Sequence, residues 1–179
     1  MVSPNTLDRF IAEHRLPDSF RNTATKCYEP LAAWLRRRLT RSTPFLLGIN
    51  GAQGTGKSTL AAYLALALGE SGHRNVAVLS IDDFYLAKSE RRRLSETVHP
   101  LLATRGVPGT HDVPMLRDCL STLLELEPGE NCRLPRFDKA ADDRADEASW
   151  PTVPGPVDLV ILEGWCVGST AEPDAGLEE

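Results

Sequence analysis

The chain has 179 residues, of which 41% are apolar and 25% charged, and its formal net charge is −5. This length and apolar content suit one globular domain with a buried core and exclude a low-complexity disordered chain. Much of the negative charge lies at the end of the sequence, in Glu172, Asp174, Glu178 and Glu179. The rest of the chain is nearly neutral, which argues against a nucleic-acid coat or a membrane-surface binder.

The sequence contains no targeting or membrane signal that we can identify. No stretch approaches eighteen consecutive apolar residues, and residues 1–16 carry charges where a secretory signal peptide needs an apolar run. The cysteines form no CxxC pair, so zinc or redox chemistry has no support; they are Cys27, Cys119, Cys132 and Cys166. We expect these thiols to be free and buried, as in a cytoplasmic protein. We expect no nucleic-acid or membrane partner, and the sequence does not define the oligomeric state.

Helical and extended patterns alternate along the chain. Residues 1–43 are expected to be helical, and Leu31, Leu35 and Leu39 have helical spacing within them. Apolar runs typical of buried parallel strands cover residues 45–49, 75–81 and 157–162, and helices are predicted over 58–68 and 115–126. This order predicts an α/β fold with a parallel sheet, with one further strand near Arg133. The charged segment 138–147 is expected to be a mobile surface loop.

A phosphate-binding motif lies between the first predicted strand and the helix that follows it. Residues 51–58 read GAQGTGKS and match G-x-x-x-x-G-K-[ST] at every fixed position. Its glycines let backbone N–H groups turn towards phosphate oxygens, and the helix start adds further N–H groups. Lys57 is expected to reach the β- and γ-phosphates, and the Ser58 hydroxyl to ligate Mg²⁺. The predicted nucleotide-binding residues are Gly51, Ala52, Gln53, Gly54, Thr55, Gly56, Lys57, Ser58 and Thr59.

Carboxylates follow two of the predicted strands. Asp82 and Asp83 come directly after residues 75–81, and Glu163 directly after 157–162. Open α/β sheets bind ligands at the carboxyl ends of their strands, so these groups are candidates to bind metal or accept a proton. The alternative is that Asp82 and Asp83 only start a loop or cap a helix. Asp158 precedes its strand and is expected to be structural.

Several motifs together resemble a known kinase family. Besides the phosphate loop they are IDDFYL (81–86), RGVPGTHD (105–112), LPRFDKAADDRAD (134–146) and VDLVILEGWCVG (157–168). They are similar to D-glycerate 3-kinase of the plant and fungal type and its bacterial relatives. This type falls within the uridine kinase, phosphoribulokinase and pantothenate kinase group of P-loop kinases.

The resemblance implies a P-loop NTPase-type parallel sheet flanked by helices. We expect one kinase domain over residues 1–179, made of an N-terminal helical segment (1–43), a nucleotide- and substrate-binding core (44–168) and an acidic end (169–179). Members of the family normally continue well past the LEGW strand. We therefore expect the usual C-terminal segment to be lacking here.

The resemblance also implies roles for individual residues, with ATP and Mg²⁺ as cofactors. Asp82 would be the catalytic base, with Asp83 the less favoured candidate, and Lys57 would assist transfer. Glu163, with Ser58, would hold the metal ion. Phe137 and Asp138 would lie near the acceptor.

The acceptor implied by the family, glycerate, carries a carboxylate. Arg and Lys are the natural partners of a carboxylate, and several basic residues lie in the family motifs. The candidate substrate-binding residues are Arg105, His111, Arg136, Asp138, Lys139 and Arg144. As a set they favour a small acid over a nucleoside. Two alternatives stay open, namely a P-loop kinase for a nucleoside or another small alcohol, and a nucleotide-binding module without catalysis.

Overall fold

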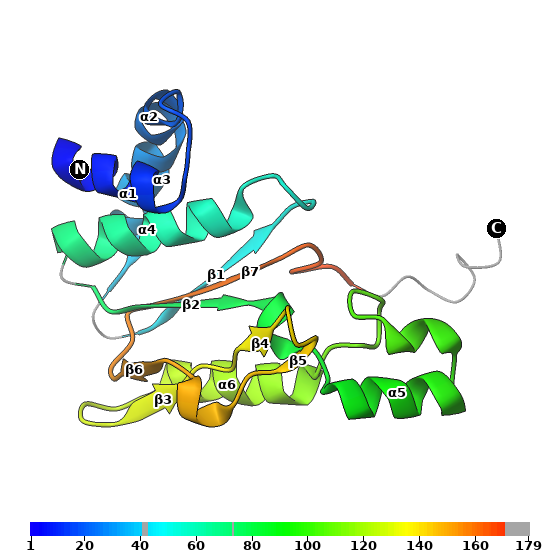
Figure 1. The fold of residues 1–179 in the computed structure, drawn as a ribbon. Coiled ribbons are helices and arrows are strands. Elements are labelled where there is room, and N and C mark those ends of the chain that lie inside the picture. The colour runs from blue at the N-terminus through cyan, green and yellow to red at the C-terminus, as the bar shows by residue number, and fades with distance from the viewer. Residues whose placement is uncertain (41–42, 73, 171–179) are drawn as a thin grey trace.

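The computed structural model describes residues 1–40, 43–72 and 74–170, and a three-stranded parallel sheet forms its centre (Figure 1). In spatial order the strands are β1 (Phe45–Asn50), β7 (Leu159–Gly164) and β2 (Val76–Ser80). The helices that cover the sheet are α4 (Lys57–Gly72) and α6 (Val113–Glu125). The predicted parallel sheet flanked by helices is therefore confirmed.

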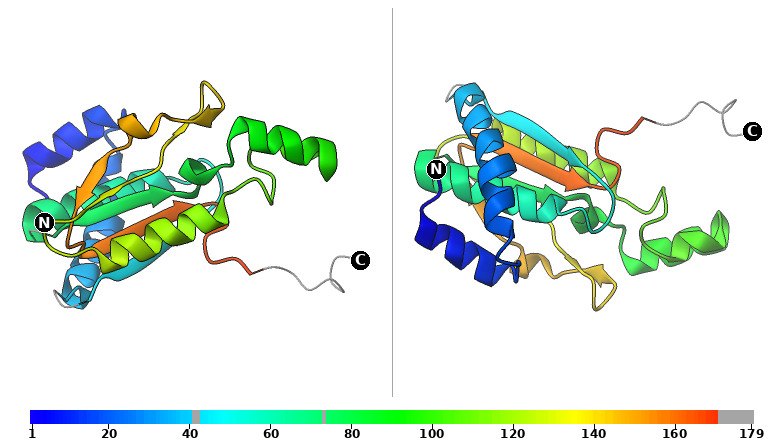
Figure 2. Two further views of the ribbon diagram at one scale, coloured as in Figure 1. Left: turned by 90° about the horizontal axis from the view of Figure 1, so that it is seen from below. Right: turned by 90° about the horizontal axis from the view of Figure 1, so that it is seen from above.

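The central strand β7 is buried on both faces (Figures 1 and 2). Its Leu159 and Ile161 pack into the core under α4 with Leu64, whereas Val160 packs on the other side with Leu123 of α6. Successive side chains of a strand point to opposite faces, so a strand covered on both sides needs apolar residues at every position. This explains the unbroken apolar run in the sequence.

The N-terminal segment forms a second helical layer on α4 (Figure 1). It consists of α1 (Pro4–Glu13), α2 (Phe20–Thr23), the π-helix η1 (Ala24–Tyr28) and α3 (Glu29–Arg38). The ring of Phe20 packs among those of Phe10, Tyr28 and Tyr63, and the Tyr63 hydroxyl donates a 2.8 Å hydrogen bond to Glu29. Helices cover residues 4–13 and 20–38 of the segment 1–43 that was predicted to be helical, with a turn between them; residues 41–42 lie outside the described part.

Two strand predictions need correction. β1 is not buried on both faces: it lies at an edge of the sheet, its residues alternate between half-buried and exposed, and Leu46 is 45% exposed. β7 begins at Leu159 rather than at Val157, and it includes Glu163 and Gly164. Asp158 accepts a 2.8 Å hydrogen bond from the backbone N–H of Asn75, which fits the structural role expected for it.

The chain between β2 and β7 contains more regular structure than its sequence indicates. It contains η2 (Ile81–Phe84), α5 (Lys88–Thr97), η3 (Pro100–Ala103), β3 (Asn131–Arg133), β4 (Phe137–Asp138), β5 (Asp143–Arg144), η4 (Glu147–Ser149) and β6 (Thr152–Pro154). The strand expected near Arg133 is β3, but it pairs with β6 in a separate sheet. Residues 138–147 are not a mobile loop: β4 and β5 form an antiparallel hairpin there.

The thiols differ in exposure. Cys119 and Cys132 are buried as expected, Cys166 is half-buried, and Cys27 is exposed, so the expectation of burial is wrong for Cys27. All four are free. Over the described ranges, the structure contains no helix that is both long and apolar enough to cross a bilayer.

Candidate active site

The phosphate loop connects the end of β1 to the start of α4. Gly54 and Gly56 have φ angles of 77° and 85°, the left-handed region that favours glycine. Thr55 Oγ1 and Lys57 Nζ each donate a 2.8 Å hydrogen bond to the carbonyl of Ala52. The loop thus stabilises its own bend, and it leads into the first turn of α4, whose N–H groups and positive dipole end suit an anion.

A cleft of about 260 Å³ opens beside this loop. Because β1, β7 and β2 are parallel, their carboxyl ends meet at the same edge of the sheet, and the cleft lies there. It is lined by Gln53, Gly54, Lys57, Ser58, Ser80, Asp82, Lys139, Glu163, Gly164 and Trp165. The structure therefore brings Asp82, Lys139 and Glu163 together with the phosphate loop. The other predicted nucleotide-binding residues lie outside this lining: Gly51, Ala52, Thr55, Gly56 and Thr59.

Ser58 and Glu163 form the part of the cleft that suits a metal ion. Ser58 Oγ donates a 3.0 Å hydrogen bond to Glu163 Oε1, although 105 residues separate them in the sequence. Glu163 is 6% exposed, and its carboxylate has no basic partner among the described ion pairs. A hydroxyl and a carboxylate are the hard oxygen ligands that Mg²⁺ prefers, so these residues fit the ion that the phosphate loop implies.

Asp82 lies at the start of η2 with both carboxylate oxygens engaged. Oδ2 accepts a 2.8 Å hydrogen bond from Lys139 Nζ, and Oδ1 accepts one of 3.1 Å from the Tyr85 hydroxyl. Burial alone would raise the pKa of Asp82, but the hydrogen bonds and charge of Lys139, helped by Tyr85, outweigh it and hold the pKa below 3.8. Asp82 is therefore ionised at neutral pH.

Asp83 is not among the residues that line the cleft. Its Oδ1 accepts a 3.2 Å hydrogen bond from the backbone N–H of Phe137, and its Oδ2 forms a 3.3 Å ion pair with Arg136. Burial raises the pKa of Asp83 despite these partners. Asp83 thus joins η2 to the start of the β4–β5 hairpin, and its place in the fold favours the structural alternative over the role of base.

Of the basic residues predicted to bind the substrate, Lys139 lines the cleft, whereas Arg105, Arg136 and Arg144 do not. Arg105 pairs with Asp142 at 2.6 Å, Arg136 with Asp83, and Arg144 with Asp112. Those three arginines are therefore engaged with protein carboxylates, and the structure does not assemble them into the expected clamp around an acid.

Two further predicted substrate-binding residues also have local roles. Asp138 Oδ1 accepts hydrogen bonds from the backbone N–H groups of Ala140 (2.8 Å) and Ala141 (3.0 Å), which fixes the turn of the hairpin. The ring of His111 stacks on that of Tyr85, with centroids 4.3 Å apart. Burial lowers the pKa of His111, and its buried Nε2 has no hydrogen-bond partner in the described part of the chain. His111 is therefore neutral at neutral pH, and its ring packs against that of Tyr85.

The comparisons with known proteins point to one group of kinases. An uncharacterized kinase of Schizosaccharomyces pombe is 40% identical over 70% of this chain, and the chloroplastic D-glycerate 3-kinase of Arabidopsis thaliana is 35% identical over 70%. A solved structure of D-glycerate 3-kinase from Cryptococcus neoformans superposes with a TM-score of 0.70 at 32% identity over 90% of this chain. The chain is homologous to D-glycerate 3-kinase. Uridine kinases and pantothenate kinases are further relatives, whereas no protein-family model matches the chain.

The chain spans only part of these D-glycerate 3-kinase homologues. It covers 47% of the S. pombe kinase, 29% of the Arabidopsis enzyme and 57% of the Cryptococcus structure. The resemblance seen in the sequence motifs is confirmed, and the fold is that of the P-loop kinases. The predicted acidic end, 169–179, falls almost wholly outside the described residues.

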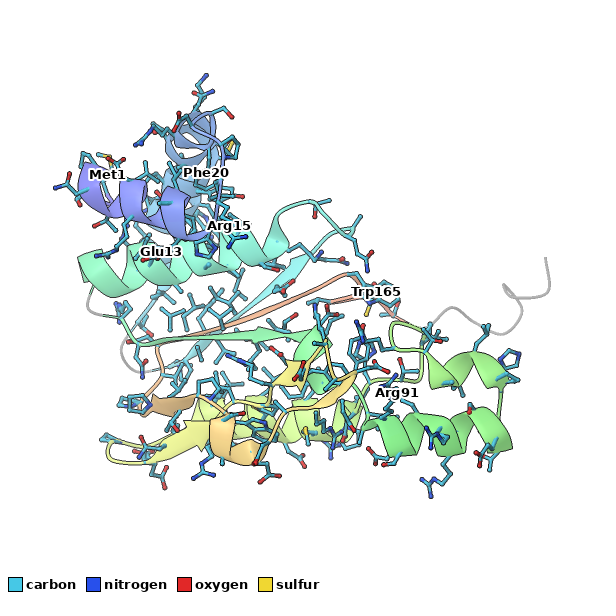
Figure 3. All side chains as sticks on the ribbon, in the orientation of Figure 1. Met1, Glu13, Arg15, Phe20, Arg91 and Trp165 are labelled. Atoms are coloured by element: carbon cyan, nitrogen blue, oxygen red, sulfur yellow. The ribbon has the colours of Figure 1, made fainter. Side chains whose placement is uncertain are left out.

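Two aromatic residues near the cleft, Tyr85 and Trp165, were not among the predicted site residues. Tyr85, Trp165 and Gly106 line a neighbouring cavity of about 510 Å³ together with Ala52 and Gln53 of the phosphate loop. Figure 3 shows Trp165 just beyond the carboxyl end of β7. The sequence did contain a signal for both residues. Tyr85 and Trp165 each lie two or three positions after a strand-end carboxylate, in the motifs DDFY and LEGW.

Proposed function

We propose that this protein transfers the γ-phosphoryl group of ATP to a hydroxyl of a small acid, with D-glycerate as the acceptor. The observation that carries the proposal is the cleft itself, in which Lys57 and Ser58 of a phosphate loop face Asp82 and Glu163 from the ends of two other strands. The homology to D-glycerate 3-kinase supports the choice of acceptor.

The phosphate side of the cleft binds and orients ATP. Backbone N–H groups of residues 51–58 and the Lys57 ammonium surround the β- and γ-phosphates and neutralise charge that spreads over the transferring group. Ser58 and Glu163 would hold Mg²⁺, which when bound supplies further positive charge to the phosphate oxygens. Binding ATP with its γ-phosphate towards Asp82 brings the reacting groups close, which itself lowers the barrier.

Asp82 acts as the base on the acceptor side. Its carboxylate is ionised and lines the cleft, so it can orient the acceptor hydroxyl and take its proton. The hydroxyl oxygen forms a bond to the γ-phosphorus as the bond from that phosphorus to the bridging oxygen of ADP breaks. The proton goes to Asp82, and the products are ADP and the phosphorylated acid.

A panel of acceptors tests this function. The 179-residue chain is incubated with ATP, Mg²⁺ and either D-glycerate, uridine or pantothenate, and ADP release and the phosphorylated product are measured. We expect ADP release that depends on D-glycerate and a phosphoglycerate product detectable by ³¹P NMR. Turnover of uridine or pantothenate without turnover of D-glycerate would reject the proposed acceptor, and ATP binding with no transfer to any acceptor would favour the nucleotide-binding module.

A further inference from the structure

We propose that Lys139 is a specificity-determining residue that exchanges between the carboxylate of Asp82 and the carboxylate of the acceptor, so that only an anionic acceptor frees the base. The inference rests on the proposed function and deepens it. It assigns to one lysine both the recognition of an acid and the release of Asp82 for catalysis.

The hairpin that carries Lys139 is fixed at several points, whereas Lys139 itself is exposed. Asp83 accepts a hydrogen bond from the backbone N–H of Phe137. The fully buried Arg91 donates a 2.6 Å hydrogen bond to the carbonyl of Asp142 (Figure 3). Asp138 fixes the turn between them. The side chain of Lys139 is nevertheless 61% exposed, and it reaches into the cleft from this anchored turn. A long, solvated side chain on a fixed backbone can change partner without moving the fold.

Lys139 is also the cation that an incoming carboxylate would meet. The other basic residues of the hairpin and of the loop before α6 are Arg105, Arg136 and Arg144, and each is paired with a protein carboxylate outside the cleft. Lys57 belongs to the phosphate side. Among the described residues, Lys139 is therefore the ammonium group beside Asp82 that an entering acid meets, and it already binds a carboxylate.

The pair with Lys139 makes Asp82 a weaker base than it would be alone. The hydrogen bond and charge of Lys139 lower the pKa of Asp82 against the effect of burial. When Lys139 turns to the acceptor, Asp82 loses this partner and keeps the Tyr85 hydroxyl, 3.1 Å from Oδ1. Its Oδ2 is then free to accept the proton of the acceptor hydroxyl, and its pKa moves up towards the range that suits a general base.

The geometry also limits the class of acceptor. Lys139 Nζ and Asp82 Oδ2 are 2.8 Å apart, so an acceptor that engages both must carry its hydroxyl and its carboxylate within a few bonds of each other. Short hydroxy acids meet this condition. A neutral alcohol of the same size leaves Lys139 on Asp82 and the base engaged.

The test compares D-glycerate with its neutral amide, D-glyceramide, as acceptors. The variants are Lys139→Met, which keeps the length and removes the charge, Lys139→Arg, and Lys26→Met as a control on the exposed face of η1. We expect Lys139→Met to lower kcat/KM for the acid on the order of 100-fold. For the amide, kcat/KM should rise, because Lys139→Met removes the ammonium group that engages Asp82 when no acid is bound, so the preference for the acid is lost. Lys139→Arg should retain part of that preference, and Lys26→Met all of it.

Two results would count against the inference in different ways. If Lys139→Met still prefers the acid as strongly as the wild type does, Lys139 does not exchange between Asp82 and the acceptor. The proposed function is unaffected by that result. A wild-type chain that phosphorylates neither compound overturns the proposed function, and this inference with it.

Discussion

The phosphate loop is one continuous stretch of chain, whereas the acceptor side of the cleft is assembled from segments that are far apart in the sequence. Residues 51–58 form a loop that holds its own bend, with Lys57 and Thr55 both bonded to the carbonyl of Ala52. The acceptor side joins residues 81–85, 105–112 and 136–144 through ion pairs between arginines and aspartates.

This difference has consequences for how each side tolerates change. The phosphate side depends on backbone N–H groups and on the conformation of a few glycines, which a local motif supplies in full. The acceptor side depends on partly buried charge pairs, in which loss of one member leaves the other without its partner. Substitutions in these charge pairs of the acceptor side should therefore act through positioning and stability, whereas substitutions of Lys57 or of the base Asp82 should act through chemistry.

The largest effect is expected from Lys57→Met. Removal of the ammonium group takes away positive charge that neutralises the transferring phosphoryl group, so kcat should fall by about 100- to 1,000-fold. The free energy of unfolding should change little, because the described contact of the Lys57 ammonium group is a single hydrogen bond to the backbone carbonyl of Ala52. Steady-state kinetics together with denaturant unfolding measure both. A variant that unfolds much more easily would contradict the separation between the two sides.

Arg91→Met should be the most destabilising change on the acceptor side. Arg91 is fully buried and donates hydrogen bonds to the carbonyls of Leu86 (3.1 Å), Ala103 (3.0 Å) and Asp142 (2.6 Å). Its loss leaves these three carbonyls and the Asp142 carboxylate, 3.1 Å from Arg91, without this partner, at a cost of about 3 kcal/mol or more. Urea unfolding measures the change, and the exposed Arg92→Met on the same helix should alter stability by less than about 0.5 kcal/mol. Equal stability of the two variants would show that Arg91 does not hold this side together.

Ser58→Ala should weaken the response to Mg²⁺ by a moderate amount. Without the hydroxyl, the metal ion loses one ligand next to Glu163, so the Mg²⁺ concentration for half-maximal activity should rise about tenfold. Ser58→Thr restores a hydroxyl and should restore most of the response. An unchanged Mg²⁺ dependence in Ser58→Ala would place the metal ion elsewhere.

The smallest effect concerns the pair between Lys139 and Asp82. Because the pKa of Asp82 is lowered in the folded protein, the pair stabilises the fold above pH 3.8, and this contribution is lost as the pH falls through the folded pKa. Lys139 is largely exposed, so Lys139→Met should cost less than about 1 kcal/mol at neutral pH. It should raise the pKa of Asp82, which ¹³C NMR of labelled aspartate can follow. A pKa that does not move would show that Lys139 has no electrostatic influence on Asp82.

Much of the sheet and of the phosphate side could be predicted from the sequence, because their signals are local. The runs around β2 and β7 are apolar over several consecutive residues, and the phosphate loop has fixed spacing between β1 and α4. β1 looked like a fully buried strand because an apolar run gives no information on its neighbours, and at the edge of the sheet Leu46 is left exposed.

The acceptor side could not be predicted in the same detail, for a physical reason. Arg105, Arg136 and Arg144 look like free cations in the sequence, and only the fold reveals that Asp142, Asp83 and Asp112 lie opposite them. The helix α5 is made mostly of charged and polar residues, so its one buried residue, Arg91, gives no periodic signal. Partners that are distant in the chain leave no local pattern.

Glycerate-dependent ADP release by Asp82→Asn and Asp83→Asn, measured side by side, tests the central claim most directly. The two residues are adjacent in the chain, but one lines the cleft and the other binds Arg136 and Phe137. We predict that Asp82→Asn lowers kcat by about 100-fold or more with ATP binding retained. Asp83→Asn should keep most of the activity and lose stability instead. Full activity in Asp82→Asn, or loss of catalysis without loss of stability in Asp83→Asn, would contradict the assignment of Asp82 as the base.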